Sequence, residues 1–194
     1  QVLRKLCMNE YRGLNVILIS EGYEAIYSGM TPGYIKKFYS LKDISIDLQR
    51  LCFNAGATFI KDIVINLDTQ NQKVYLKDNP SVSFDILSIN SGSISNNQNI
   101  NLNNESKVIP VKPISSLLSN LSHIDNLVKK SSQKKISIVG GGVAAFELSF
   151  ALYKRYNGNI SLNIISSPLL AEKNLNISTI NKLKKIANNL GINL

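Results

Sequence analysis

Short apolar runs alternate with polar or glycine-rich stretches along the chain, and this pattern predicts a succession of helices and strands. Val2–Met8 has the spacing of the tail of a helix, and Gly13 separates it from the next run. Leu14–Ile19 is mostly apolar, which is typical of a buried parallel strand. Because the chain starts at Gln1 and within a helical pattern, we expect further sequence upstream.

A loop rich in Gly, Tyr and Pro occupies residues 21–39, and long loops of special composition are often functional. Apolar residues then recur at helical spacing from Ile44, and Gly56 stands where a helix C-terminal glycine should stand. This pattern predicts a helix from about Asp43 to Ala55. Strands are predicted next at Thr58–Leu67, Lys73–Lys77 and Val82–Ile89, the first two forming a hairpin or meander.

The stretch Ser91–Ser106 consists mainly of Ser, Asn and Gly, which predicts an exposed loop and the best candidate for a boundary region. A helix is predicted from about Ser115 to Lys130. The chain closes with a helix from about Ile177 to Leu190, whose apolar stripe is explained by core packing. Ile192–Leu194 should begin another strand, so the last predicted domain is incomplete.

A glycine motif follows the predicted strand Lys135–Val139 directly. Gly140 permits a tight turn, Gly142 lets the backbone approach a pyrophosphate, and the small Ala145 allows close packing of helix on strand. The N–H groups at the start of the helix would then face the phosphate charge. Since a second strand is predicted at Ile160–Ile165, the motif lies in a complete β-α-β unit and predicts a dinucleotide site. A glycine-rich turn without a ligand is the alternative.

The end of that second strand departs from the usual pattern. Strands in this position commonly end in an acid that binds the adenosine ribose, whereas this one ends in Ser166 and Ser167, with no acid or Arg before Glu172. The preference between NAD and NADP therefore stays open, and nucleotide binding could be weakened.

Composition excludes several other functions. The net charge of +9 comes from scattered pairs of Lys without interleaved aromatic residues, so a nucleic-acid partner is not expected. Cys7 and Cys52 form no close pair, and His123 is the single histidine, so we expect no metal centre, redox dithiol or Ser-His-Asp triad. No apolar run is long enough for a transmembrane helix and no signal peptide is recognisable, which favours a cytoplasmic location.

Two segments resemble the FAD-dependent pyridine nucleotide oxidoreductases, specifically the branch related to type II NADH dehydrogenases. Phe84–Ser93 is similar to the strand and turn that close the FAD site in this family, and Gly140–Glu147 is similar to its second glycine motif. The resemblance implies that Ser91 and Gly92 contact the flavin. It also implies that Glu147 lies near the nicotinamide or flavin, where the alternative is a solvated helical acid.

Three further segments resemble more narrowly the flavoprotein module that is fused ahead of selenide, water dikinase. They are Tyr27–Gly33, Ile46–Leu48 and Ile109–Ile114. This resemblance implies that Tyr27, Ser28, Gly29 and Pro32 bind FAD and that Lys112 could approach the flavin, where a cation stabilises the reduced ring. Ordinary turn and linker roles are the alternatives. Ser20 stands where many relatives carry the acid that binds the FAD ribose, and Glu21 lies beside it.

The resemblance implies an α/β fold with two Rossmann-like dinucleotide-binding folds, the first lacking its N-terminal strand and the second truncated at its C-terminus. The implied domains are a partial FAD-binding domain at 1–112 and the first part of an NAD(P)H-binding domain at 113–194. The cofactors would be FAD and NAD(P)H, which bind side by side for hydride transfer. The glycine turn for FAD would precede Gln1, so the chain alone is expected to bind FAD poorly and to be inactive.

Two hypotheses about function follow from the resemblance. In the first, the protein is an oxidoreductase that passes a hydride from nicotinamide to flavin and then to an unknown acceptor, either a quinone or a selenium compound. In the second, it is a non-catalytic flavin- or nucleotide-binding regulatory module that is covalently linked to selenide, water dikinase. The absence of acids at Ser20 and Ser166 favours the second.

Overall fold

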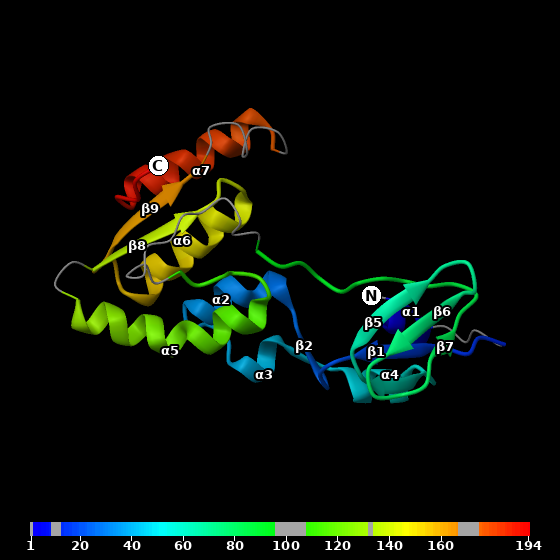
Figure 1. The fold of residues 1–194 in the computed structure, drawn as a ribbon. Coiled ribbons are helices and arrows are strands. Elements are labelled where there is room, and N and C mark those ends of the chain that lie inside the picture. The colour runs from blue at the N-terminus through cyan, green and yellow to red at the C-terminus, as the bar shows by residue number, and fades with distance from the viewer. Residues whose placement is uncertain (1, 9–12, 96–107, 132–133, 167–174) are drawn as a thin grey trace. The chain divides into compact units, whose positions relative to one another are not determined.

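The computed structural model shows a mixed α/β chain with small parallel and antiparallel sheets (Figure 1). It describes residues 2–8, 13–95, 108–131, 134–166 and 175–194. The elements group into two compact units. Unit 1 contains Gln1–Tyr27 and Ser45–Gly92, and unit 2 contains Ser28–Ile44 and Ser93–Leu194.

Unit 1 is built on a parallel pair of strands. Strand β1 (Ile17–Ser20) pairs with β4 (Thr58–Lys61) in the register Ile17 to Thr58. Helix α4 (Leu48–Asn54) packs against β4, and helix α1 (Val2–Met8) packs against α4. Helix α4 begins where the carboxylate of Asp47 accepts a hydrogen bond from the Arg50 amide at 2.9 Å, as an N-cap requires.

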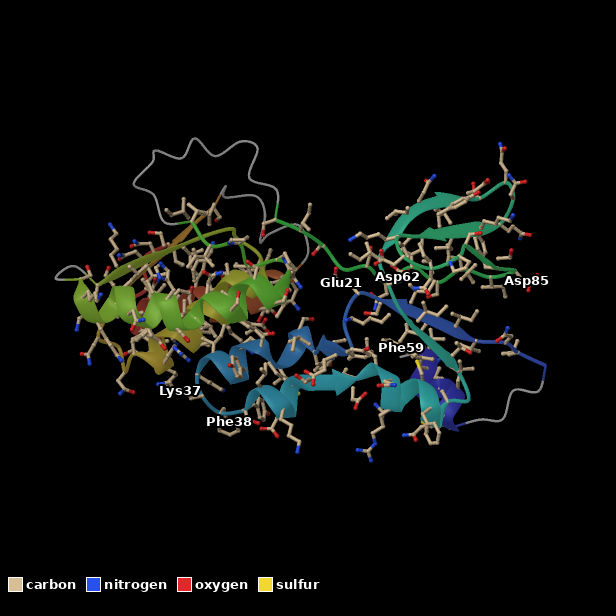
Figure 2. All side chains as sticks on the ribbon, turned by 60° about the horizontal axis from the view of Figure 1, so that its bottom comes forward. Glu21, Lys37, Phe38, Phe59, Asp62 and Asp85 are labelled. Carbon is tan, nitrogen blue, oxygen red and sulfur yellow. The ribbon has the colours of Figure 1, made fainter. Side chains whose placement is uncertain are left out.

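An antiparallel meander completes unit 1. Its strands are β5 (Val64–Asp68), β6 (Lys73–Leu76) and β7 (Val82–Ser83), in that order. Asp62 lies at the junction of β4 and β5 (Figure 2) and is 6% exposed. Its carboxylate accepts hydrogen bonds from the amides of Asp78 and Asn79, which ties the junction to the loop after β6.

A separate antiparallel pair marks the boundary of unit 1. Strand β2 (Glu24–Ile26) pairs with β3 (Ser45–Asp47), Ile26 lying opposite Ser45. The segment between these strands, Ser28–Ile44, belongs to unit 2 and contains the 3-10 helix η1 (Ser28–Met30), α2 (Thr31–Ile35) and α3 (Leu41–Ile44).

Unit 2 contains a parallel β-α-β arrangement. Strand β8 (Lys135–Val139) leads into α6 (Val143–Arg155), and β9 (Ser161–Ile165) returns parallel to β8 with Lys135 opposite Ser161. Helix α5 (Ile114–Lys130) precedes these elements and α7 (Ile177–Asn189) follows them. Helix α2, drawn in blue in Figure 1, packs against the yellow α6. The buried side chains of unit 2 form one apolar core, which contains Ile35, Leu117, Leu121, Phe146, Leu152, Leu162, Ile164 and Ala187.

Three predictions about secondary structure are corrected. The helix predicted over Asp43–Ala55 is interrupted, because Ser45–Asp47 pairs with β2 as strand β3. The strand predicted over Val82–Ile89 ends at Ser83, and the next residues find no partner strand among those described, leaving Ile86 90% exposed. The strand predicted over Leu14–Ile19 starts only at Ile17, and its residues are half-buried.

The strand predicted over Thr58–Leu67 is also corrected, because Asp62 and Ile63 divide it into β4 and β5. The helices and strands predicted between Lys135 and Leu190 are present, with ends that differ by one or two residues, whereas Ile192–Leu194 forms only an isolated bridge from Asn193 to Asn163. Ser91–Ser95 has no regular structure, and the rest of the predicted loop to Ser106 lies outside the described residues. In the part of the chain that is described, no helix is both long and apolar enough to cross a bilayer.

Candidate dinucleotide site

The turn between β8 and α6 forms the candidate site. Gly140 has a φ of 136°, a conformation that L-residues rarely adopt, and its amide donates a hydrogen bond to the carbonyl of Ile165 at 2.8 Å. Gly142 is the N-cap of α6, with an extended backbone and no side-chain capping bond. The first turn of a helix leaves N–H groups without intrahelical partners. The turn thus presents helix amides where a phosphate would bind.

The space around the two outer glycines is open on the side of the described residues. A Cβ atom built on Gly140 or on Gly142 would meet no atom of the described residues within 4 Å. Gly140 is required by its backbone conformation, but Gly142 has an ordinary φ of −80°. Neither its conformation nor packing against the described residues requires glycine at 142. In the part of the chain that is described, the turn thus leaves room for a group such as a pyrophosphate.

Ala145 and Ser149 place the start of α6 against the core of unit 2. Ala145 is 5% exposed and belongs to the apolar core. One turn later, the fully buried Ser149 hydroxyl donates to the Ala145 carbonyl at 2.7 Å. A side chain larger than Ala at 145 would push the helix away from its neighbours. Ala145 and Ser149 thus pack the first turns of α6 closely on the core, while Gly142 at the N-terminus of this helix stays exposed.

Only some of the residues considered with the rest of a nucleotide are described. Ser166 is exposed at the end of β9, and Ser167 and Glu172 lie outside the described residues. Glu147 is exposed on α6, one turn after the glycines. Among the described residues, no group of His, Cys, Asp and Glu is arranged to hold a metal ion, and both cysteines are free.

The predicted flavin contacts are divided between the two units. Ser28, Gly29 and Pro32 belong to unit 2, whereas Tyr27, Ser91 and Gly92 belong to unit 1. The structure therefore does not gather these residues within one unit.

Two residues named with the flavin site have local contacts. Half-buried Lys112 is joined to Ser95 by its backbone, since its amide donates to the Ser95 hydroxyl at 3.2 Å and its carbonyl accepts from the Ser95 amide at 3.3 Å. Ser20 ends β1, and its hydroxyl accepts a long hydrogen bond of 3.5 Å from the Gly22 amide.

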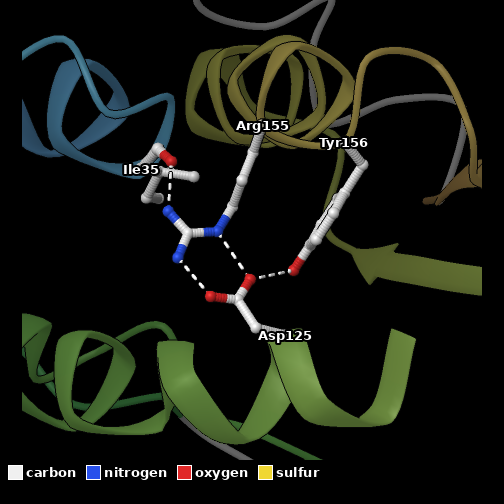
Figure 3. Close-up of polar contacts among 4 residues, drawn as sticks. All are labelled: Ile35, Asp125, Arg155 and Tyr156. Carbon is white, nitrogen blue, oxygen red and sulfur yellow. Dashed lines mark hydrogen bonds and ion pairs between the residues drawn. The ribbon is translucent and has the colours of Figure 1, made fainter. Parts of the chain in front are cut away.

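Sequence reasoning missed a polar cluster within unit 2 (Figure 3). Arg155 donates from Nε and Nη2 to the two carboxylate oxygens of Asp125 at 2.8 and 2.6 Å. The Tyr156 hydroxyl donates to the same carboxylate at 2.8 Å, and Nη1 of Arg155 donates to the carbonyl of Ile35 at 2.6 Å. In the sequence, Arg155 is simply a cation in the last turn of a helix, where such residues are common. Nothing near Arg155 in the sequence indicates that Asp125 and Ile35 would contact it.

This cluster changes the protonation behaviour of its members. Hydrogen bonds from Arg155 lower the pKa of Asp125, despite the opposing effect of burial. Burial, followed by the hydrogen bond to Asp125, raises the pKa of Tyr156 to about 12. At neutral pH the pair is thus a charged carboxylate and guanidinium with a neutral phenol beside them.

A second residue that sequence reasoning missed is Thr31. It is 2% exposed at the start of α2, and its hydroxyl oxygen has no hydrogen-bond partner among the described residues. An apolar groove of about 780 Å³ lies between α5 and β8 in the same unit, and the described residues that line it include Lys134 and Lys135 but no carboxylate. Thr31 lies within the segment Tyr27–Gly33 that the sequence predicted to contact flavin, but it was not itself named as a contact, and the groove has no counterpart in the predicted site.

Comparisons with known proteins give structural relatives only. No family model and no curated protein matches the sequence. The fold is similar to that of NDH2 from Plasmodium falciparum in complex with NADH, with a TM-score of 0.80 and 18% identity over 97% of this chain and 44% of that one. It is also similar to NADH:rubredoxin oxidoreductase from Clostridium acetobutylicum, with a TM-score of 0.65 and 22% identity over 98% and 48%.

A third similar structure is a ferredoxin reductase from Rhodopseudomonas palustris, with a TM-score of 0.74 and 14% identity over 100% of this chain and 46% of that one. The chain therefore spans less than half the length of these proteins. At these identities the likeness establishes a shared fold.

Proposed function

We propose that this chain is part of an FAD-dependent NAD(P)H oxidoreductase in which unit 2 binds the nicotinamide nucleotide. The observation that carries the proposal is the glycine turn before α6, where Gly142 is required neither by its backbone nor by its neighbours. The folds with which the chain aligns include an NADH complex and an NADH:rubredoxin oxidoreductase, which supports the same class of reaction.

Each proposed role follows from the position of a residue. The amides at the start of α6 would bind the pyrophosphate, and Gly140 would hold the turn that points them outward. Ala145 would keep α6 close to the core, so that the amides stay fixed. When bound, the two cofactors supply the hydride chemistry, and the protein supplies orientation and electrostatics.

The finer predictions from the sequence stand as part of this proposal. They include two Rossmann-like folds, domains at 1–112 and 113–194, and a cytoplasmic location. They also include flavin contacts from Tyr27, Ser28, Gly29, Pro32, Ser91 and Gly92, and roles for Lys112 and Glu147 beside the reacting rings. A quinone and a selenium compound remain the two proposed acceptor classes.

A non-catalytic module linked to selenide, water dikinase is the second candidate. It is favoured by Ser20 and Ser166, which stand at the ends of β1 and β9 where ribose-binding acids are usual. Rapid mixing of the flavin-loaded full-length protein with NADH and with NADPH separates the candidates. An oxidoreductase bleaches its flavin absorbance within a turnover, whereas a module without turnover stays oxidised.

Substitution of Gly142 tests the site itself. A graded pair, Gly142→Ala and Gly142→Val, places one and then three carbon atoms where the phosphate should lie, and we expect NADH affinity to fall progressively, by about 100-fold or more for Val. Calorimetric titration of the full-length protein measures this. Because a Cβ at 142 meets no atom of the described residues within 4 Å, both variants should fold as the parent does. Unchanged affinity in Gly142→Val would refute the proposed site.

A further inference from the structure

The segment Ser28–Ile44 links the two units in an unusual way. It leaves unit 1 at the end of β2 and returns at the start of β3, and these strands pair directly with Ile26 opposite Ser45. Both ends of the segment are therefore held side by side in unit 1. Its middle, however, is part of unit 2, since Ile35 is 1% exposed and lies in the core of that unit.

Arg155 fastens this segment at one point. Helix α2 has only five residues, and the last carbonyls of such a helix have no intrahelical partners. The carbonyl of Ile35, the last residue of α2, accepts a hydrogen bond of 2.6 Å from Nη1 of Arg155. A charged donor makes this bond stronger than one between neutral groups. The guanidinium thus completes a helix end that is 120 residues away in sequence.

Asp125 fixes the direction of the Arg155 side chain. Its two oxygens bind Nε and Nη2, so the planar guanidinium cannot rotate and its third nitrogen must point at Ile35 (Figure 3). The side chain of Arg155 is 9% exposed and that of Asp125 is 26% exposed, so solvent screens the pair only in part. A Lys at 155 would keep the charge but lose the fork geometry.

Arg155 thus holds the segment that contains Ser28, Gly29 and Pro32. We propose that Arg155 and Asp125 are positioning residues: they fix this segment to the nucleotide-binding unit and thereby set the flavin contacts relative to the nicotinamide. This inference rests on the proposed function. Hydride transfer needs the reacting atoms within about 3–3.5 Å, and a misplacement of about 1 Å costs roughly 100-fold in rate. Loss of the pair should therefore slow the reaction while the glycine turn still binds nucleotide.

Two variants and a matched control test whether the pair fixes the segment. Arg155→Lys and Asp125→Asn remove the fork, and Lys154→Met changes the exposed neighbouring cation on the same helix. Hydrogen exchange in the full-length protein should become about tenfold faster at the amides of Lys36 and Phe38, which bond to the carbonyls of Pro32 and Gly33. Exchange in β5 and β6 should not change. Parent-like exchange at Lys36 and Phe38 in both variants would overturn the inference.

Rapid mixing of the flavin-loaded full-length protein with NADH tests whether the fixed segment positions the flavin. We expect the rate of flavin reduction per bound flavin to fall about 10- to 100-fold in Arg155→Lys, with NADH affinity within about twofold of the parent. A purely structural role would lower the yield of folded protein but leave this rate unchanged.

The outcomes distinguish failure of the proposed function from failure of the positioning role. If the parent itself does not reduce its flavin with either nucleotide, the proposed function fails before any variant is examined. If the parent is active and Arg155→Lys reduces flavin as fast as Lys154→Met, the positioning role is wrong and the proposed function stands. If affinity falls in step with rate, the pair supports nucleotide binding and the positioning role is again wrong.

Discussion

The two units differ in what holds them together. Unit 2 buries a continuous apolar core in which Leu162 and Ala187 are 1% and 0% exposed, and its members come from α2, α5, α6, β9 and α7. The buried side chains described in unit 1 are fewer, namely Leu3, Cys52, Asp62, Val74 and Leu76. All four residues of β1 are half-buried. Apolar burial therefore contributes much less to unit 1.

Hydrogen bonds within turns make up a larger share of the stabilising contacts in unit 1. Asp62 accepts hydrogen bonds at the junction after β4, and Asp68 accepts from the amides of Gln70 and Asn71 in the turn between β5 and β6. Such bonds fix loop geometry but contribute less net free energy than a filled core. A change of side-chain volume should therefore cost more in unit 2 than in unit 1, whereas unit 1 depends mainly on the hydrogen bonds within its turns.

The largest expected effect is a cavity in the core of unit 2. Leu162→Ala should lower the free energy of unfolding by about 2–5 kcal/mol, because the side chain is fully buried. The matched change Leu18→Ala, in half-buried β1, should cost less than half as much. Guanidinium titrations of both variants measure this, and equal losses would contradict the contrast between the units.

The next effect comes from the ion pair in unit 2. Asp125→Asn keeps the shape of the side chain but removes its charge, so we expect a loss of about 1–3 kcal/mol in the free energy of unfolding. The turn variant Asp68→Asn in unit 1 is the comparison, and its cost should be smaller because its partners are exposed amides. Urea titration can rank the two variants, and the reverse order would be evidence against a special role for Asp125.

Mild acid should weaken unit 1 through Asp62. The Asn79 side-chain hydrogen bond, together with the amides of Ile63, Asp78 and Asn79, lowers the pKa of Asp62. A folded-state pKa below the unfolded value of about 3.9 gives stability that is present above that pH and is lost as pH falls through the folded pKa. Thermal unfolding from pH 6 downward should show a decline below about pH 4 that is shallower in Asp62→Asn. Identical pH profiles would remove Asp62 as a cause.

The smallest effect is expected at high pH in unit 2. The pKa of Tyr156 is raised to about 12, above the unfolded value of about 10. The contribution of this group is fully present below about pH 10 and is lost as pH rises toward the folded pKa. Tyr156→Phe should abolish this part of the alkaline decline, and ultraviolet titration of the phenolate should show one tyrosine fewer with a delayed transition. An unchanged titration curve would show that Tyr156 is not the delayed group.

Local signals explain which parts of the fold could be predicted. The elements from α5 to α7 follow from apolar periodicity together with Gly140, Asn157-Gly158 and Gly191, which act within a few residues of themselves. The helix predicted over Asp43–Ala55 failed because Ile46 pairs with Ala25 in a strand, and this partner is distant in sequence. Pairing with a distant strand overrides a helical pattern that is only local.

The candidate site, like the fold, was predictable only where its sequence signal is local. The glycine turn has a fingerprint within eight residues, so its position followed from the sequence. The contact of Arg155 with Ile35 has none, because the two residues lie on elements that meet only in the folded chain. The assignment of Ser28–Ile44 to unit 2 depends on the burial of Ile35 and was equally invisible.

The excursion of Ser28–Ile44 into unit 2 also constrains how the chain can be made. Ile35 leaves the ribosome long before Arg155, which is translated 120 residues later. At typical rates of about 5–20 residues per second, the segment waits roughly 6–24 s for the helix against which it will pack. During that time its apolar side chains have no site to fill, although β2 and β3 can already pair and hold the two ends together. We therefore expect Ile35 to stay exposed on the nascent chain until α6 is made, and a pause in translation before α6 would lengthen this exposure.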